Sequence, residues 1–254
     1  MRLETMVLEK KGKVGRLTLQ RPDLLNAMNH QAVLDLNRAA ESVRGDEDIR
    51  VVLVRGEGRA FSTGIDLKEL SAGGSGLEYH KHFERALRTL ETTEKIVLAA
   101  MHGYCLGGGL QLALACDIRL STPDCVIGLP AIRECLVPGL STFRLPRYIG
   151  LGRAKHLILS GDNIDGRRAY EIGLVDHLAT SENFALEAEH LAQKYLRTCS
   201  EGSRQSKVLL NLAADMNHGL FLEEYHRRQA ITQLSSDHDE AMRAYRENRD
   251  PIWR

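Results

Sequence analysis

Short apolar runs alternate with helical periodicity over the first 150 residues of the chain. A run such as Val51–Val54 is uncharged and only a few residues long, which is typical of a strand buried on both faces of a sheet. Elsewhere, apolar residues recur at spacings of three and four, which predicts amphipathic helices. Strands and helices that alternate in this way predict βαβ units around a parallel sheet, and so an α/β fold. The expected elements are strands over 51–54, 96–100, 117–120 and 125–128 and helices over 33–43, 83–90 and 110–116.

Beyond residue 150 the pattern becomes mostly helical. We therefore divide the chain into an α/β core over residues 1–195 and a helical C-terminal region over 196–254. Late helices that cannot all pack on one sheet often cover a neighbouring subunit, so this region is expected to mediate oligomerisation. Helix 183–198 should point Glu187 toward solvent, opposite an apolar stripe of Phe184, Ala188, Leu191 and Tyr195. The expected helices are 151–159, 167–172, 183–198, 203–217, 219–234 and 238–248.

Composition and charge exclude several classes of protein. Of the 254 residues, 43% are hydrophobic and 27% are charged, which is typical of a globular chain and not of a disordered one. Lys plus Arg number 34 and Asp plus Glu also number 34, so the chain lacks the basic excess of proteins that bind nucleic acid or anionic lipid. Five scattered cysteines without a CxxC pair predict no disulfide framework and no zinc site, and they fit a reducing compartment such as the cytoplasm.

One segment is long enough to cross a membrane. Ile96–Cys116 contains 21 residues without a formal charge. It also contains His102, Gln111 and four glycines. We therefore interpret it as a buried strand, a glycine turn and a buried helix, and we expect no membrane span. The N-terminus lacks the apolar stretch of a signal peptide.

Two glycine-containing segments carry the candidate chemistry. They are Arg59–Leu70 (RAFSTGIDLKEL) and His102–Leu112 (HGYCLGGGLQL). In each, glycine follows an expected strand and precedes a helical stretch, where free N–H groups and the positive end of the helix dipole are available. Glycine also lets a ligand come close to the backbone. Two such backbone sites that face one point would stabilise a developing negative charge.

Taken together, these segments resemble the crotonase superfamily, that is, the enoyl-CoA hydratases and isomerases of acyl-CoA and fatty acid metabolism. The resemblance extends from about residue 15 to about residue 180. It implies a spiral of βαβ units that holds an acyl-CoA thioester, assembled as a homotrimer or as a hexamer of two trimers. The matching pieces are Arg21-Pro22, Asn26-Ala27-Met28, Ala60–Lys68, Gly103–Ala113, Cys116–Ile118, Pro138-Gly139, Arg144-Leu145 and Gly173–Val175, in that order.

The resemblance also implies roles for individual residues. The backbone N–H groups of Ile65 and Gly108 are expected to bind the thioester oxygen and to stabilise an enolate. Removing one such donor costs about 3–4 kcal/mol in enzymes where this has been tested. Asp23 stands where the family often has a lysine, which removes one contact with the CoA phosphates. Coenzyme A enters as part of the substrate, and no separate cofactor or metal is expected. The residues expected along the CoA moiety are Leu24, Leu25, Thr63, Asp66, Leu67 and Lys68.

The chain departs from the family at the two general acid–base positions. The hydratases use two glutamates, and the matching positions here are Gln111 and Ala131. Gln111 can orient a water or a carbonyl, but neither side chain takes up a proton near neutral pH. A positioned acid or base contributes about 10²–10⁴-fold to a rate, so the usual hydration mechanism is lost. Glu134 reaches nearly the same face as Ala131 if the segment is helical. Otherwise Glu134 is a surface residue paired with Arg133.

Three functions stay open from the sequence. The first is a lyase or isomerase of the hydratase/isomerase type, in which Glu134 or a histidine acts as the base. The stretch with Tyr79, His80 and His82 roofs the acyl pocket in this superfamily, which places the candidate histidines. The second is a decarboxylase or a C–C hydrolase, which needs the oxyanion hole but less proton transfer. The third is a non-catalytic subunit that binds a CoA thioester, with no titratable group near the acyl carbon.

Overall fold

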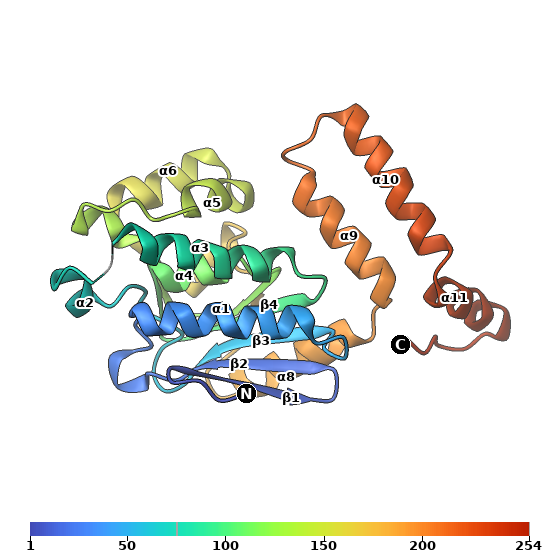
Figure 1. The fold of residues 1–254 in the computed structure, drawn as a ribbon, viewed down its shortest axis with the longest axis horizontal. Helices are drawn as coiled ribbons and strands as arrows, with labels where there is room; N and C mark the ends of the chain where they lie inside the picture. Colours follow the sequence, from blue (N-terminus) through green and yellow to red (C-terminus); the bar gives the residue numbers. More distant parts are fainter. Residues whose placement is uncertain (75, 254) are drawn as a thin grey trace.

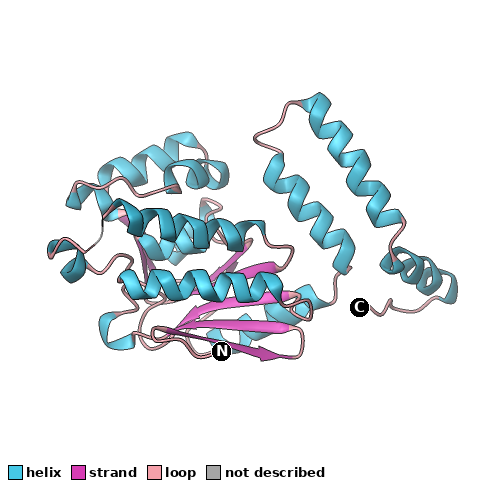
Figure 2. Cartoon of the chain, in the orientation of Figure 1, coloured by secondary structure: helices cyan, strands magenta, loops and turns pink. Residues whose placement is uncertain are grey.

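The computed structural model describes residues 1–74 and 76–253, and it places helices on both faces of a six-stranded sheet (Figures 1 and 2). The strands are β1 (Met6–Lys11), β2 (Val14–Leu19), β3 (Val51–Gly56), β4 (Ile96–Met101), β5 (Tyr104–Leu106), β6 (Ile118–Ser121), β7 (Val126–Gly128), β8 (Asn163–Asp165) and β9 (His177–Leu178). The α-helices are α1 (His30–Gly45), α2 (Leu67–Ser71), α3 (Leu77–Thr92), α4 (Gly108–Leu114), α5 (Ser141–Ile149), α6 (Leu151–Ser160), α7 (Gly166–Glu171), α8 (Phe184–Leu196), α9 (Ser200–Leu212), α10 (His218–Gln233) and α11 (Ser236–Glu247). Two 3₁₀ helices are η1 (Pro22–Leu24) and η2 (Pro130–Glu134).

The large sheet has the strand order β1-β2-β3-β4-β6-β9, and β5, β7 and β8 form a second, smaller sheet. The pairs from β2 to β9 are parallel, as predicted, whereas β1 and β2 form an antiparallel hairpin that the sequence analysis did not predict. Strand β3 shows why an uncharged run becomes a central strand. Val52 and Val54 face one hydrophobic core, and Val51 and Leu53 face the other.

Helices α1 and α3 pack together on one face of the sheet, and α8 packs on the other. The predicted apolar stripe of α8 is confirmed, because Ala188 and Leu191 are buried and Phe184 packs against the same core. Glu187 is exposed, as expected. The alternation of strands and helices in this order confirms the α/β fold class.

The apolar segment Ile96–Cys116 divides into β4, β5 and α4, as a strand, a turn and a helix. Helix α4 begins at Gly108, two residues before the predicted start, because the last two glycines of the triplet form its first turn. Within the described residues, no helix combines the length and the apolar character that crossing a bilayer demands.

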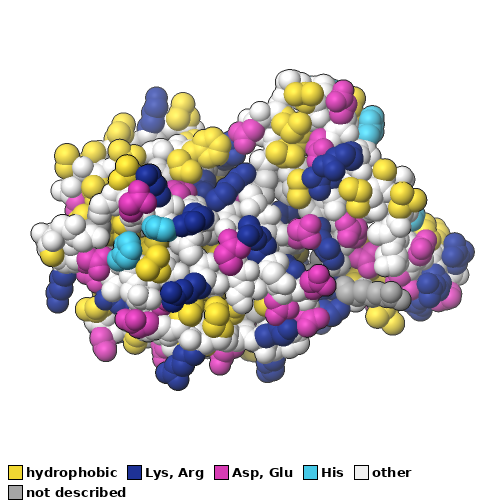
Figure 3. Space-filling model, viewed as in Figure 1, with side chains coloured by type: hydrophobic (Ala, Val, Ile, Leu, Met, Phe, Trp, Pro, Cys, Tyr) yellow, Lys and Arg dark blue, Asp and Glu magenta, His cyan; other side chains and the backbone are white. Residues whose placement is uncertain are grey.

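The last three helices, α9 to α11, form an arm beside the α/β core (Figure 1). Lys207 anchors α9, because its Nζ donates to Asp117 at 2.7 Å and to the Lys95 carbonyl at 2.8 Å. Large apolar side chains of the arm remain exposed, among them Leu210 and Leu234, and Figure 3 shows apolar groups on this surface. The expected trimerisation through residues 196–254 stays a prediction, and Arg254 lies outside the described residues.

Candidate functional site

Three loops meet at the carboxyl side of the large sheet and bring the two glycine segments together. The Met28 N–H donates to the Gly64 carbonyl at 2.7 Å, and the Asp66 N–H donates to the Met28 carbonyl at 3.0 Å. On the other side, the Ser62 N–H donates to the Tyr104 carbonyl at 3.0 Å, and Ser62 pairs with Cys105 in a parallel bridge. The segment that contains Ile65 is therefore held between the loop that contains Met28 and the glycine turn that contains Tyr104.

Gly64 allows the two segments to touch. Its φ is +88°, and a Cβ at this position would stand 2.5 Å from the Gly108 nitrogen and 2.7 Å from the Leu106 oxygen. Gly109 also has no room for a side chain, because an added Cβ would stand 2.5 Å from the Ser62 backbone oxygen. These glycines therefore permit backbone-to-backbone packing between residues 62–64 and the start of α4.

The N–H groups of Ile65 and Gly108 have no hydrogen-bond acceptor among the described residues. The peptide between Gly64 and Ile65 is planar and trans, so the Ile65 N–H points away from Met28, to which the Gly64 carbonyl is bonded. Gly108 is the first residue of α4, so its N–H has no acceptor inside the helix. Across residues 1–74 and 76–253, neither amide donates a hydrogen bond to another protein group. Both are available to an external acceptor.

A cavity of about 230 Å³ borders these two residues. Its wall also contains Gln111, Glu134 and Thr63, so all four predicted catalytic residues meet at one cavity. The rest of the wall is mostly apolar. The apolar side chains include Ile65, Leu67, Phe83, Leu106, Leu136 and Val137.

Glu134 reaches the cavity from the 3₁₀ helix η2. A 3₁₀ helix has three residues per turn, so Ala131 and Glu134 lie above one another, and both border the cavity. Arg133 instead approaches Asp162, at 3.8 Å. Glu134 is exposed, as the surface alternative expected, but no ion pair joins it to Arg133 among the described residues. Among the described residues of the cavity wall, Glu134 is the one carboxylate.

A buried ion-pair cluster fixes the cavity wall beyond Pro138, and the sequence analysis missed it. The Glu84 carboxylate accepts the Leu140 N–H at 3.1 Å and pairs with Arg144 at 3.0 Å. Arg144 also pairs with Glu91 at 3.1 Å, and its side chain is only 3% exposed. Burial acts to raise the pKa of Glu91, but its hydrogen bonds and charge interactions with Arg144 and Arg88 outweigh burial, so this pKa lies below its ordinary value. Leu140 and Arg144 are more than 50 residues from the glutamates that they contact, so no local sequence pattern predicts these contacts.

The start of α3 covers the cavity, as the resemblance implied. Tyr79 and His80 border it, whereas His82 does not and instead places its ring edge-on to His30. The Tyr79 hydroxyl donates to the Met28 carbonyl at 2.9 Å. Burial raises the pKa of Tyr79 well above its ordinary range, so its O–H stays protonated and available as a donor.

The residues expected along CoA fall into two groups. Thr63 and Leu67 border the cavity, whereas Leu24, Leu25, Asp66 and Lys68 do not. Leu25 nevertheless lies beside Thr63, because its carbonyl accepts the Thr63 N–H at 3.1 Å.

Asp66 has structural partners in this arrangement. Its carboxylate caps the N-terminus of α2 and pairs with Arg21 at 3.0 Å. Its expected contact with CoA, like those of the other residues of this set, stays a prediction.

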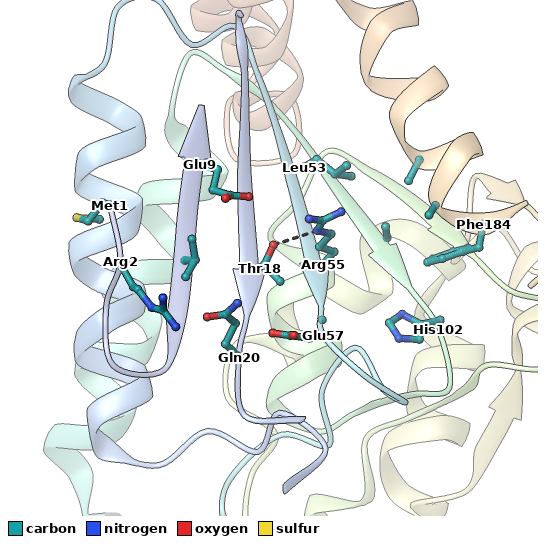
Figure 4. Close-up of a pocket in the computed structure, with 15 residues that line it drawn as sticks. Met1, Arg2, Glu9, Thr18, Gln20, Leu53, Arg55, Glu57, His102 and Phe184 are labelled. Carbon is teal, nitrogen blue, oxygen red and sulfur yellow. Dashed lines mark hydrogen bonds between the residues drawn. The ribbon is translucent and has the colours of Figure 1, made fainter. Parts of the chain in front are cut away.

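A larger groove of about 700 Å³ lies on the α8 face of the sheet (Figure 4). It is lined by charged side chains of strands β1 and β3, such as Glu9 and Arg55, and by Phe184 of α8. His102 belongs to this groove, where its Nε2 donates to the Gly58 carbonyl at 2.9 Å and its ring packs near Phe184. The groove shares no lining residue with the cavity at Ile65 and Gly108. We take the smaller cavity as the candidate site because Ile65 and Gly108, whose amides are unbonded, both line it.

In the described part of the chain, no cluster of three or more His, Cys, Asp or Glu side chains is placed to hold an ion.

Comparison with known proteins gives the family. The model of the enoyl-CoA hydratase/isomerase family matches residues 9–254. The chain belongs to the enoyl-CoA hydratase/isomerase family. It is 31% identical over 255 residues to a short-chain-enoyl-CoA hydratase of Clostridium acetobutylicum, which covers 98% of this chain and 97% of that protein. It is also 31% identical over 256 residues to a crotonyl-CoA hydratase of Syntrophomonas wolfei, with coverage of 98% and 97%.

Solved structures agree with this assignment. The crystal structure of an enoyl-CoA hydratase from Bacillus anthracis superposes with a TM-score of 0.92 at 27% identity, and the match covers 98% of this chain and 99% of that one. The resemblance to the crotonase superfamily and the expected fold are therefore confirmed, and the protein is a member of an enzyme family related to acyl-CoA.

Proposed function

We propose that this protein binds an acyl-CoA thioester with its carbonyl oxygen between the N–H groups of Ile65 and Gly108, and that Glu134 serves as the base. The carrying observation is that two unbonded amides on touching backbone segments and one carboxylate border the same cavity. Two N–H donors aimed at a carbonyl oxygen stabilise the charge that develops when the adjacent carbon loses a proton. The protein then acts as an enoyl-CoA isomerase or lyase.

The proton transfer needs only one carboxylate when the reaction is an isomerisation. Glu134 removes a proton from the acyl chain, and the electron pair of that C–H bond moves onto the thioester oxygen as an enolate. The same carboxyl group then returns the proton to a second carbon, and the double bond has moved. Gln111 contributes an amide that orients the acyl group or a water but transfers no proton. Hydration by two carboxylates, by contrast, has no counterpart at residues 111 and 131.

The charges on the cavity wall favour an uncharged acyl group. The titratable side chains there are Tyr79, His80 and Glu134, and the Tyr79 hydroxyl is already bonded to Met28. A carboxylate on the substrate would meet the negative charge of Glu134 in a mostly apolar cavity, which costs free energy. The cavity therefore favours an enoyl-CoA substrate over the carboxyacyl-CoA that a decarboxylase requires.

The test is a panel of 3-enoyl-, 2-enoyl- and malonyl-CoA thioesters with Glu134→Gln and a matched control. We expect Glu134→Gln to lower enoyl-CoA turnover by about 10²–10⁴-fold while binding is retained, because only the proton acceptor is removed. Glu187→Gln, at an exposed glutamate of α8, should leave turnover unchanged.

Other outcomes would replace the proposal. Release of CO₂ from malonyl-CoA would establish decarboxylation instead. Tight binding with no product from any thioester would leave binding alone as the function. Failure of every thioester to bind would refute the site itself.

A further inference from the structure

The Tyr79 hydroxyl joins the roof of the cavity to the backbone that carries the Ile65 amide. Tyr79 lies in the first turn of α3, is 3% exposed and lines the cavity. Its O–H donates to the Met28 carbonyl at 2.9 Å, across 51 residues of the chain. Tyr79 therefore connects the cavity wall with the loop that contains Met28.

Met28 is the residue that orients the Ile65 amide. Its N–H donates to the Gly64 carbonyl at 2.7 Å, and this carbonyl belongs to the same peptide as the Ile65 N–H. Because that peptide is planar, the bond to Gly64 sets the direction in which the Ile65 N–H points. The Met28 carbonyl accepts two hydrogen bonds, from the Asp66 N–H at 3.0 Å and from Tyr79.

We infer that Tyr79 is a positioning residue, which holds Met28 so that the Ile65 N–H keeps its aim at the thioester oxygen while the acyl group packs against the Tyr79 ring. This inference rests on the proposed function, since it assumes that the Ile65 amide is an oxyanion donor. Tyr79 touches the acyl group and acts on the reacting carbonyl through Met28, so its hydroxyl matters for the chemical step more than for binding.

A second tyrosine provides the matched comparison. The Tyr148 hydroxyl donates to the Leu114 carbonyl at 3.2 Å, so it makes the same kind of bond. Leu114 is the last residue of α4, at the opposite end of that helix from Gly108, and Tyr148 does not border the cavity. Tyr148→Phe thus removes a tyrosine–carbonyl bond without touching the Ile65 segment.

The experiment uses a conjugated 2,4-dienoyl-CoA as a spectroscopic probe, because hydrogen-bond donors on the thioester oxygen polarise the conjugated system and move its absorption to longer wavelength. We expect the bound probe to show a red shift in the wild-type protein and in Tyr148→Phe, and a clearly smaller shift in Tyr79→Phe. Turnover of an enoyl-CoA should fall about tenfold in Tyr79→Phe, as a small displacement of a catalytic donor implies. The dissociation constant of the probe should change little, because the phenyl ring still fills its place.

Each contrary outcome has a separate meaning. An unchanged red shift and unchanged turnover in Tyr79→Phe would overturn the positioning role and leave the oxyanion site standing. Equal losses in Tyr79→Phe and Tyr148→Phe would overturn it as well, because they would reflect a general loosening of the fold. A bound probe without any red shift in the wild-type protein would refute the oxyanion site, and the role of Tyr79 with it.

Discussion

Replacing Gly64 by alanine tests the contact on which the site depends. The added Cβ would stand 2.5 Å from the Gly108 nitrogen and 2.7 Å from the Leu106 oxygen, closer than a carbon can approach either atom. Both neighbours are backbone atoms, so no flexible side chain can turn aside. The two segments must separate, and the amides of Ile65 and Gly108 must move apart.

The size of the effect follows from two contributions. Gly64 has φ +88°, and forcing a non-glycine residue into a left-handed conformation costs about 1–2 kcal/mol. Overpacking adds about 1–3 kcal/mol. The free energy of unfolding should therefore fall by about 2–5 kcal/mol. An ordinary domain has an unfolding free energy of about 5–15 kcal/mol, so a measurable fraction of the variant should remain folded. Loss of one oxyanion donor should lower kcat by about 10²–10³-fold for the protein that remains folded.

The assay combines urea denaturation, followed by circular dichroism, with enoyl-CoA turnover per folded molecule. Gly12→Ala is the control, because Gly12 has φ +59° and a Cβ there meets no atom within 4 Å. It carries the backbone penalty without the collision and should keep full activity. If Gly64→Ala matches Gly12→Ala in both stability and turnover, the close approach of the two segments is not what forms the site.

Two further predictions concern stability and thiol reactivity. Arg144→Ala should lower the free energy of unfolding by about 3 kcal/mol in urea denaturation, because Glu84 loses its arginine partner and Glu91 keeps only Arg88. The pKa of Glu91 in the wild-type protein is lowered from 4.5, so the stability that its carboxylate contributes is present at neutral pH and is lost as the pH falls through the lowered pKa. The difference in unfolding free energy between wild type and variant should therefore narrow in acid. A difference that stays constant from pH 7 to pH 3 would contradict the pairing. In thiol titration of the native protein, the exposed Cys135 should react first, whereas three buried thiols should react only after denaturation. Burial raises the pKa of these three thiols, to about 12 for two of them, and so keeps them in the unreactive protonated form. Fast reaction of all five cysteines would contradict the packing. The buried thiols are Cys105, Cys116 and Cys125.

Much of the core could be predicted because its signals are local. The run Val51–Val54 is apolar at every position, and a strand covered on both faces needs that composition. Strand β1 was missed because it lies at the edge of the sheet, and its second half, Glu9–Lys11, is exposed and polar. Helix α5 was missed because its nine residues include Pro146, which weakens a helical pattern.

The site was predictable only in part, for a related reason. Glycine motifs marked the two segments, because glycine permits close approach of backbone to backbone, and the family resemblance then pointed to Ile65 and Gly108 within them. The sequence also placed Glu134 on the face of Ala131, because three residues of a helix suffice to decide that. Glu84 and Arg144 were missed because they are 60 residues apart, and ion pairs between distant elements leave no periodic signal.

The sequence by itself determined the alternation of strands and helices in the central part of the core, the family motifs, and the absence of a carboxylate at residues 111 and 131. These properties depend on residue type and on spacing within a few turns, which the linear chain contains in full. Only the tertiary structure decided that Glu134 shares a cavity with two unbonded amides, and that Tyr79 is bonded to Met28. Those contacts arise where loops from separate strands meet, and their hydrogen bonds join residues that are distant in the chain and close only after folding.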